Sequence, residues 1–180
     1  GFVENARMDG HKAILHTVGA SNLGQMLNRI CLEDGMGLVN IVRKDEQAKL
    51  LKDQGATHVV NSSDDDFLDQ LKAAIDDTDA FYGFEKRMFI YGRLDFGPTT
   101  LTPSYGFGWT LSGWLLTPFL QSAGMETVMR MRKRVLDNLT TTFASGYKTK
   151  VDLEGMLTKD AILDYRQMKT GEKYLVMPHG

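Results

Sequence analysis

The chain has 180 residues, of which 42% are hydrophobic and 24% charged, and its formal net charge at pH 7 is −2. These values indicate one globular domain with a sizeable core, and they give no reason to expect binding to nucleic acid or to an anionic membrane. The single cysteine, Cys31, excludes an internal disulfide and a multi-cysteine zinc site, and no metal is required. Because there is no apolar run of about 18 residues and no signal peptide, we expect a cytoplasmic protein without a membrane span.

The chain begins with a weakly patterned stretch. Residues 1–10 have the mixed composition of a linker helix that follows a preceding domain, and His11 to Val18 are predicted to form the first strand. His16 within this strand could be a ligand. An isolated histidine in a strand is more often packed into the core, and we predict that His16 is packed.

A turn of small residues follows this strand and leads into a strongly patterned helix. Gly35 and Gly37 are predicted to end the helix, since glycine is favoured just past a helix end. A strand, a turn, a helix and a second apolar run, Leu38 to Lys44, make half of a mononucleotide-binding unit. The sequence therefore predicts an α/β fold with a doubly wound parallel sheet, the Rossmann fold, in three layers (α/β/α). The apolar face of the helix consists of Leu23, Met26, Leu27, Ile30 and Cys31.

The turn has the properties that a pyrophosphate requires. Backbone N–H groups at the positive end of a helix bind phosphate when no side chain is in the way. Gly19 is expected to make the sharp turn out of the strand, and Gly24 to let the helix lie close to the sheet. Ser21 stands where the usual fingerprint has its middle glycine, but it is small and its hydroxyl can donate. An ordinary strand-to-helix loop is the alternative. The candidate cofactor-binding residues are Gly19, Ala20, Ser21, Asn22, Leu23 and Gly24.

The end of the second strand indicates which nucleotide would bind. A site selective for NAD usually places an Asp or Glu about 20 residues beyond the glycines, where it accepts from the ribose hydroxyls. Val42, Arg43 and Lys44 stand at that place in this chain. Two cations can pair with a 2′-phosphate, so Arg43 and Lys44 are candidate binding residues and NADP is the predicted cofactor. The alternative is two solvated charges in front of a helix.

The next segments continue the alternation of strands and helices. We predict a helix over Asp45–Gln54, a strand at His58–Val60 and a helix with apolar residues from Phe67 to Ile75. In this fold the third strand ends beside the adenine and ribose half of the cofactor. Asn61 and Ser62 are therefore candidate contacts, with plain capping of the next helix as the alternative.

The later part of the chain is less regular. We predict a strand at Arg87–Gly92, followed by a turn-rich loop. Tyr105–Gly124 is rich in aromatic residues and glycine, which suits a lid, a subunit interface or core packing. Met125–Phe143 is predicted to be one long amphipathic helix. Its inward residues would be Val128, Val135, Leu139 and Phe143, and a basic cluster, Arg130, Arg132, Lys133 and Arg134, would face solvent. Short helices at 153–157 and 161–168 would lie between strands at 147–151 and 173–177.

Several segments resemble the cofactor domain of zinc-independent medium-chain dehydrogenases/reductases, in the quinone-oxidoreductase-like branch. The resemblance covers residues 11–79 and 87–178. Its motifs are His-Thr-Val-Gly-Ala-Ser-Asn-Leu-Gly-Gln-Met-Leu from residue 16, Leu-Val-Asn-Ile-Val-Arg-Lys from 38, Leu-Leu-Lys-Asp-Gln-Gly-Ala-Thr-His-Val-Val-Asn from 50, Ile-Tyr-Gly-Arg-Leu-Asp from 90, Gly-Trp-Leu-Leu-Thr-Pro-Phe-Leu from 113 and Thr-Gly-Glu-Lys-Tyr-Leu from 170.

The chain departs from this family near Ala80. A parallel crossover and its strand need more than a dozen residues, and only about ten separate the helix near Asp76 from the strand at Arg87. Either the natural polypeptide is longer at this point or a central strand is deleted. We favour the first, because a deletion would expose the core. Tyr82 and Lys86 spell the Tyr-x-x-x-Lys of short-chain dehydrogenases, but that chemistry needs both residues on one helix face, and a strand begins at once.

The resemblance implies an NADP(H)-binding domain of an alcohol dehydrogenase-like oxidoreductase. Such an enzyme transfers hydride between NADPH and a small-molecule substrate, a quinone, an enone or a carbonyl/alcohol, and it forms a homodimer through its cofactor domains. Gly92, Arg93 and Leu94 would contact the nicotinamide. Because the family's N-terminal catalytic domain is absent, no catalytic residue can be named. One alternative is a non-catalytic NADP-binding sensor or structural module. Another is a methyltransferase, which would need an acidic residue near Val42 to bind the ribose of its cofactor.

Overall fold

The computed structural model describes residues 1–78, 80, 86–90, 109–144, 149–151, 154 and 174–176. The chain divides into two compact units, which are treated separately below. One unit consists of Gly1 and residues 81–134. The other consists of residues 2–80 and 135–180, and it contains the glycine-rich turn.

The unit with the glycine-rich turn is built on a parallel sheet of three strands in the order β1-β2-β3. Strand β2 pairs with β1 and β3 on its two sides, so that His16 lies beside Asn40 and Val42 beside Asn61. Each crossover between these strands contains a helix, as the sequence predicts. The elements in this part are α1 (Phe2–Met8), β1 (Ala13–His16), α2 (Asn22–Asp34), β2 (Gly37–Val42), α3 (Asp45–Asp53), β3 (His58–Asn61) and α4 (Phe67–Thr78).

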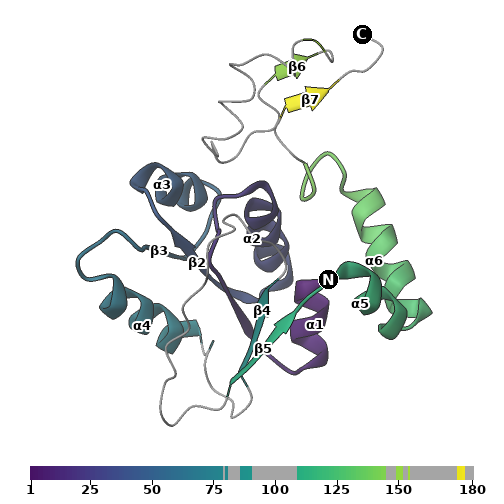
Figure 1. The fold of residues 1–180 in the computed structure, drawn as a ribbon, viewed down its shortest axis with the longest axis horizontal. Coiled ribbons are helices and arrows are strands. Elements are labelled where there is room, and N and C mark those ends of the chain that lie inside the picture. The colour runs from purple at the N-terminus through teal and green to yellow at the C-terminus, as the bar shows by residue number, and fades with distance from the viewer. Residues whose placement is uncertain are drawn as a thin grey trace. The chain divides into compact units, whose positions relative to one another are not determined.

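The sheet is covered on both faces. Alternate residues of a strand point to opposite faces, and in β2 Leu38 and Val42 pack in the clusters that include α2 and α3 residues, whereas Val39 packs with Ala74 of α4. Helices α2 and α3 therefore lie on one face and α4 on the other, as Figure 1 shows. The predicted three-layer α/β/α fold of the Rossmann type is confirmed for this sheet.

Helix α2 ends at one of the glycines that the sequence predicts, and its N-cap is a residue that the sequence was expected to use for phosphate binding. Ser21 is the N-cap, and its Oγ accepts from the Gly24 N–H at 3.0 Å. Gly35 ends the helix in the left-handed region, with φ of 64°. The weakly patterned residues at the start form a helix, α1, whose Val3 packs in the same cluster as Leu27, Cys31 and Leu38.

The long helix predicted near residue 130 is shorter than expected. Helix α6 (Met125–Asp137) ends six residues before Phe143. Val135 and Leu139 are 38% and 54% exposed, so the prediction that they point inward is wrong. Local hydrogen bonds compete with the helix here, because the Thr141 N–H donates to the Asn138 carbonyl. Arg130, Arg132 and Lys133 are exposed, as predicted.

Arg29 of α2 holds the segment that follows α6. Its Nε donates to the carbonyl of Thr142 at 2.9 Å, and its guanidinium also donates to the carbonyl of Ala144 at 2.8 Å. The Thr142 hydroxyl in turn bonds to Glu33, also on α2. These contacts make Thr142 almost fully buried although it follows a run of polar residues.

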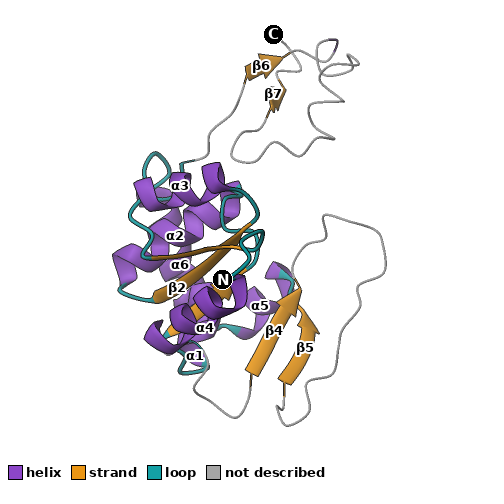
Figure 2. Cartoon of the chain, turned by 90° about the vertical axis from the view of Figure 1, so that its left-hand side faces the viewer, coloured by secondary structure: helices purple, strands orange, loops and turns teal. Residues whose placement is uncertain are grey.

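The described part of the second unit contains a pair of parallel strands, the helix that follows them and most of α6. Strands β4 (Lys86–Ile90) and β5 (Trp109–Gly113) pair over their whole length and lie side by side in Figure 2. Helix α5 (Leu116–Ser122) follows β5, and its Phe119 is buried with its ring centroid 5.7 Å from that of Trp114. The aromatic stretch thus contains a strand and a helix that the sequence pattern does not reveal. Lys86 is the first residue of β4 and not part of a helix, which agrees with the prediction that Tyr82 and Lys86 do not form a Tyr-x-x-x-Lys site.

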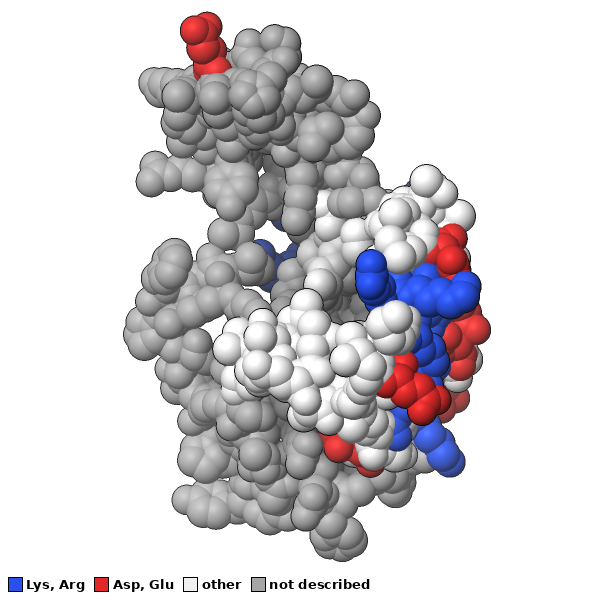
Figure 3. All heavy atoms as spheres, turned by 90° about the vertical axis from the view of Figure 1, so that its right-hand side faces the viewer, with Lys and Arg blue, Asp and Glu red and all other residues white. Residues whose placement is uncertain are grey.

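The remaining described elements are β6 (Thr149–Val151) and β7 (Tyr174–Val176), a parallel pair within the two predicted strands. The short helices predicted at 153–157 and 161–168 lie outside the described residues, apart from Glu154. Within the described ranges, no helix is long and apolar enough to cross a bilayer. In the view of Figure 3, Lys and Arg side chains lie directly beside Asp and Glu side chains, so this face does not have a single sign of charge.

Candidate functional site

Three loops meet at the carboxyl edge of the three-stranded sheet. Because β1, β2 and β3 are parallel, the residues that follow each strand lie at the same edge. Hydrogen bonds join the loops. The Gly19 N–H donates to the Ile41 carbonyl at 3.1 Å, and the Ser63 hydroxyl donates to the Arg43 carbonyl at 3.0 Å. The predicted residues that follow β1, β2 and β3 are therefore brought together.

The loop after β1 presents unpaired N–H groups at the start of α2. The Gly24 N–H is used by the Ser21 cap, and the Gln25 N–H donates to the Ser21 carbonyl. The N–H groups of Ala20, Asn22 and Leu23 have no partner in the described part of the chain. These donors stand at the positive end of a 13-residue helix, so the arrangement favours an anion.

Gly24 and Gly19 both lie in close contact with neighbouring atoms. A Cβ on Gly24 would lie 2.2 Å from the Gly19 carbonyl oxygen and 2.6 Å from that of Val18, so the first turn of α2 touches the backbone of the loop. A Cβ on Gly19 would lie 3.0 Å from atoms of Asn40 and Leu51. The φ of Gly19 is not in the left-handed region, so close packing, and not the freedom to turn, explains this glycine.

Arg43 and Lys44 follow β2 directly and are both exposed. The backbone of Arg43 is held on both sides, because its N–H donates to Gln47 Oε1 at 3.0 Å and its carbonyl accepts from Ser63. Among the described residues, no carboxylate forms an ion pair with either side chain. Two cations without a protein partner at this edge can pair with a phosphate.

Asn61 and Ser62 differ in what they can offer a ligand. Asn61 is buried, donates to Asp45 Oδ1 at 2.9 Å and accepts from the Ser63 N–H at 3.1 Å, so its amide holds the turn after β3. Asn61 does not cap the next helix, as the alternative described, because α4 begins only at Phe67. Ser62 is exposed, and only its N–H is engaged, with the Val42 carbonyl. The predicted contacts Gly92, Arg93 and Leu94 lie outside the described residues.

Two buried polar features stand behind this edge. His16, the last residue of β1, is 5% exposed, as expected for a packed histidine, and burial lowers its pKa from 6.5 to about 4. Asn28 and Asn40 are 2% and 0% exposed. Neither amide is among the residues predicted from the sequence, although Asn40 is a polar residue inside the apolar run Leu38–Val42 and could have been noticed there.

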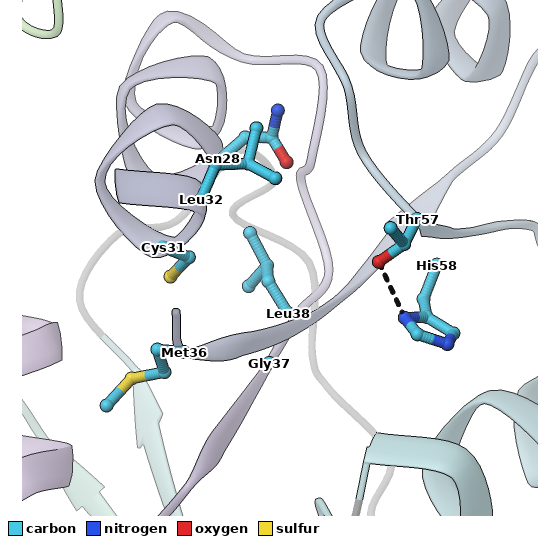
Figure 4. Close-up of a pocket in the computed structure, with 8 residues that line it drawn as sticks. All are labelled: Asn28, Cys31, Leu32, Met36, Gly37, Leu38, Thr57 and His58. Atoms are coloured by element: carbon cyan, nitrogen blue, oxygen red, sulfur yellow. Dashed lines mark hydrogen bonds between the residues drawn. The ribbon is translucent and has the colours of Figure 1, made fainter. Parts of the chain in front are cut away.

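A small pocket lies at the opposite edge, where β2 and β3 begin. Figure 4 shows it between the end of α2 and the first residues of the strands, with Cys31, Leu32, Met36 and Leu38 among its lining residues. Its lining is mostly apolar, and the Thr57 hydroxyl near it is already within 2.9 Å of His58 Nδ1. No group of His, Cys, Asp and Glu residues suited to a metal occurs in the described ranges. The carboxyl edge is therefore the better candidate.

Comparison with known proteins gives structural relatives only. No protein-family model matches the sequence, and no curated protein is similar enough to count as a relative. A protein assigned as an NADPH:quinone reductase from Mesorhizobium loti is 25% identical, with a TM-score of 0.77 over 98% of this chain and 56% of that chain. Quinone oxidoreductase from Escherichia coli complexed with NADPH is 14% identical, with a TM-score of 0.68 over 93% and 57%.

A third similar structure is a mutant form of enoyl thioester reductase from Candida tropicalis, which is 17% identical, with a TM-score of 0.67 over 92% of this chain and 53% of that chain. The predicted resemblance to quinone-oxidoreductase-like proteins is confirmed at the level of the fold. The chain spans about half the length of these proteins.

Proposed function

We propose that this chain is the NADP(H)-binding domain of an oxidoreductase that transfers hydride between NADPH and a quinone, an enone or a carbonyl/alcohol substrate. The observation that carries the proposal is the carboxyl edge. On adjacent loops lie N–H groups at the start of α2 and two cations after β2, all without a partner among the described residues, together with a Gly24 that admits no side chain. The names of the similar structures, which include an NADPH:quinone reductase and a quinone oxidoreductase with NADPH, support the same cofactor.

The residues at this edge fit the two charged parts of NADPH. The N–H groups of Asn22 and Leu23 would receive the pyrophosphate, whereas Ala20 is 2% exposed and its N–H is not accessible to a ligand. The Ser21 hydroxyl already accepts from Gly24, so its proton is available to a phosphate oxygen. Arg43 and Lys44 would pair with the 2′-phosphate, and Ser62 would stand nearest to the adenosine half. The cofactor supplies the hydride, and the chain's own part is to bind and orient it.

The preference for NADPH over NADH tests this proposal. A charge-assisted hydrogen bond contributes roughly 1.5–3 kcal/mol. Because Arg43 and Lys44 are exposed, we take the low end and expect NADPH to bind about tenfold tighter than NADH. Replacing both residues by alanine should remove this preference, as measured by titration calorimetry.

A matched control is available on α3. Lys49 and Lys52 are also exposed, and Lys49 pairs with Asp53. Replacing both by alanine makes the same change in net charge away from the loops and should leave the preference intact. Equal affinities of the unaltered protein for NADPH and NADH would contradict the role given to Arg43 and Lys44.

Turnover distinguishes the oxidoreductase from a non-catalytic NADP-binding sensor. We expect this chain to bind NADPH without oxidising it, because in a two-domain enzyme the other domain supplies the far wall of the cleft and orients the substrate. The assay follows NADPH consumption with a panel of quinones and unsaturated ketones, for this chain and for a longer protein that contains it. Turnover by this chain alone would place catalytic residues within it, and no turnover by either protein would favour the sensor.

Four parts of the proposal, namely the dimer, the location, the substrate and the nicotinamide contacts, are supported by the sequence alone. A homodimer through the aromatic stretch Tyr105–Phe119 and a cytoplasmic location remain predictions. So do the choice of substrate and the contacts of Gly92 and Leu94 with the nicotinamide.

A further inference from the structure

Two buried amides face each other behind the glycine-rich turn. Asn40 Nδ2, in the middle of β2, donates to Asn28 Oδ1 on α2 at 3.4 Å, and Asn28 Nδ2 donates to the Gln54 carbonyl at the end of α3 at 3.5 Å. The neighbours of Asn40 on the same face of the strand, Leu38 and Val42, both pack in apolar clusters. Asn40 therefore occupies a position of the strand at which the alternation of residues predicts an apolar side chain.

These amides reach the turn by two routes. Asn40 packs directly against Gly19, since a Cβ on Gly19 would lie 3.0 Å from both Asn40 Cβ and Oδ1. The side chain of Gln54 donates to Gln25 Oε1 at 2.8 Å, and Gln25 Nε2 donates to the Ala20 carbonyl at 3.0 Å. We call Gln25, Asn28, Asn40 and Gln54 the amide network.

Stability alone does not account for this network. The two bonds of Asn28, at 3.4 Å and 3.5 Å, are longer than the usual N–H···O distance of about 2.7–3.2 Å, and in the described part of the chain Asn40 Oδ1 and Gln54 Oε1 are buried without a partner. Burying an amide is unfavourable unless its hydrogen bonds are made, and replacing both members of such a pair by apolar groups of the same shape can be neutral or stabilising. The network does contact the loop, because Asn40 packs against Gly19 and Gln25 donates to the carbonyl of Ala20.

We propose that the amide network is a positioning element for the pyrophosphate subsite. By holding Gly19 and the carbonyl of Ala20, it keeps the loop in the conformation in which the N–H groups of Asn22 and Leu23 are available to a phosphate. The inference rests on the proposed function, and it adds residues that do not touch the cofactor. It predicts that losing the network weakens binding of the pyrophosphate and leaves the 2′-phosphate subsite at Arg43 and Lys44 unchanged.

The test compares two ligands on the same variants. The double variant Asn28→Leu/Asn40→Val replaces the buried pair by apolar side chains, and Gln25→Met cuts the link to the Ala20 carbonyl at a partly buried position. Titration calorimetry then gives Kd for NADPH, which contains the pyrophosphate, and for adenosine 2′-phosphate, which lacks it. We expect NADPH to bind about tenfold more weakly to both variants. Adenosine 2′-phosphate should bind as before, and the melting temperature of the double variant should be unchanged or higher.

Thr78→Val is the matched control. The Thr78 hydroxyl donates to the Ala74 carbonyl at 2.7 Å on α4, which covers the other face of the sheet, so this variant also removes a side-chain donor but should alter neither Kd. The positioning role is overturned if a folded double variant or Gln25→Met binds NADPH as tightly as the unaltered chain. It is also overturned if both ligands weaken together with a fall in melting temperature, which would indicate a structural role. If the unaltered chain binds neither ligand, the proposed function itself fails, and the inference fails with it.

Discussion

Gly24→Ala is expected to abolish measurable NADPH binding and to destabilise the unit that contains the three-stranded sheet. The added Cβ would lie 2.2 Å and 2.6 Å from the carbonyl oxygens of Gly19 and Val18, and because both are backbone atoms neither can rotate away. Forcing extra atoms into a packed contact costs about 1–3 kcal/mol. The N-terminus of α2 would also be displaced from the loop, so its N–H groups would no longer converge on one phosphate.

The effect is measured as a change in melting temperature together with the Kd for NADPH. Gly113→Ala is a suitable control, because a Cβ on Gly113 meets nothing within 4 Å and its φ is not in the left-handed region. It should change neither quantity. A Gly24→Ala chain that melts and binds like the unaltered protein would show that α2 does not touch the loop as described.

The second large effect is a loss of stability in mild acid that depends on His16. Burial lowers the pKa of His16 to about 4, against 6.5 for an unperturbed histidine. Below pH 6.5 the unfolded chain binds a proton at this residue that the folded chain does not bind until about pH 4. The free energy of unfolding should therefore be constant above pH 6.5 with respect to this group and fall by about 3 kcal/mol between pH 6.5 and 4.

Urea denaturation at a series of pH values would measure this slope. His16→Leu cannot bind the proton, so its stability should fall less between pH 6.5 and 4 than that of the unaltered chain. His11 is exposed, and His11→Gln should leave the slope as it is. If His16→Leu shows the same acid dependence as the unaltered chain, His16 is not the group responsible.

The elements that sequence reasoning predicted well are those specified by neighbouring residues. Helix α2 has its apolar residues at helical spacing and a terminal glycine, as predicted, although Leu23, which was expected on the buried face, is 43% exposed in the first turn. The glycine-rich turn is likewise local, since Gly24 touches residues only five or six positions earlier. Such features can be read from the order of residues alone.

The features that were missed depend on residues far apart in the chain. Helix α6 was predicted to continue to Phe143, because the apolar spacing continues. The structure ends it at Asp137, where Asn138 and Thr141 form local bonds and Arg29 holds Thr142. The sequence predicts Asn40 only as one residue of an apolar strand, because no neighbouring residue indicates its contacts with Asn28 and Gly19. At Asn40 a long-range contact decides against the local pattern, and after Asp137 local bonds and the contact with Arg29 together do so.

The contacts of Arg29 also bear on the order in which this chain folds. They join residues 113 and 115 positions apart, whereas β1, β2 and β3 pair with strands that follow directly along the chain. Contacts between residues close in sequence close small loops, carry the lower entropy cost and tend to form first. The unit from β1 to β3 can therefore assemble while later residues are still being synthesised, with the Arg29 guanidinium already in place on α2. We therefore expect the segment at Thr142 to dock after these three strands have assembled.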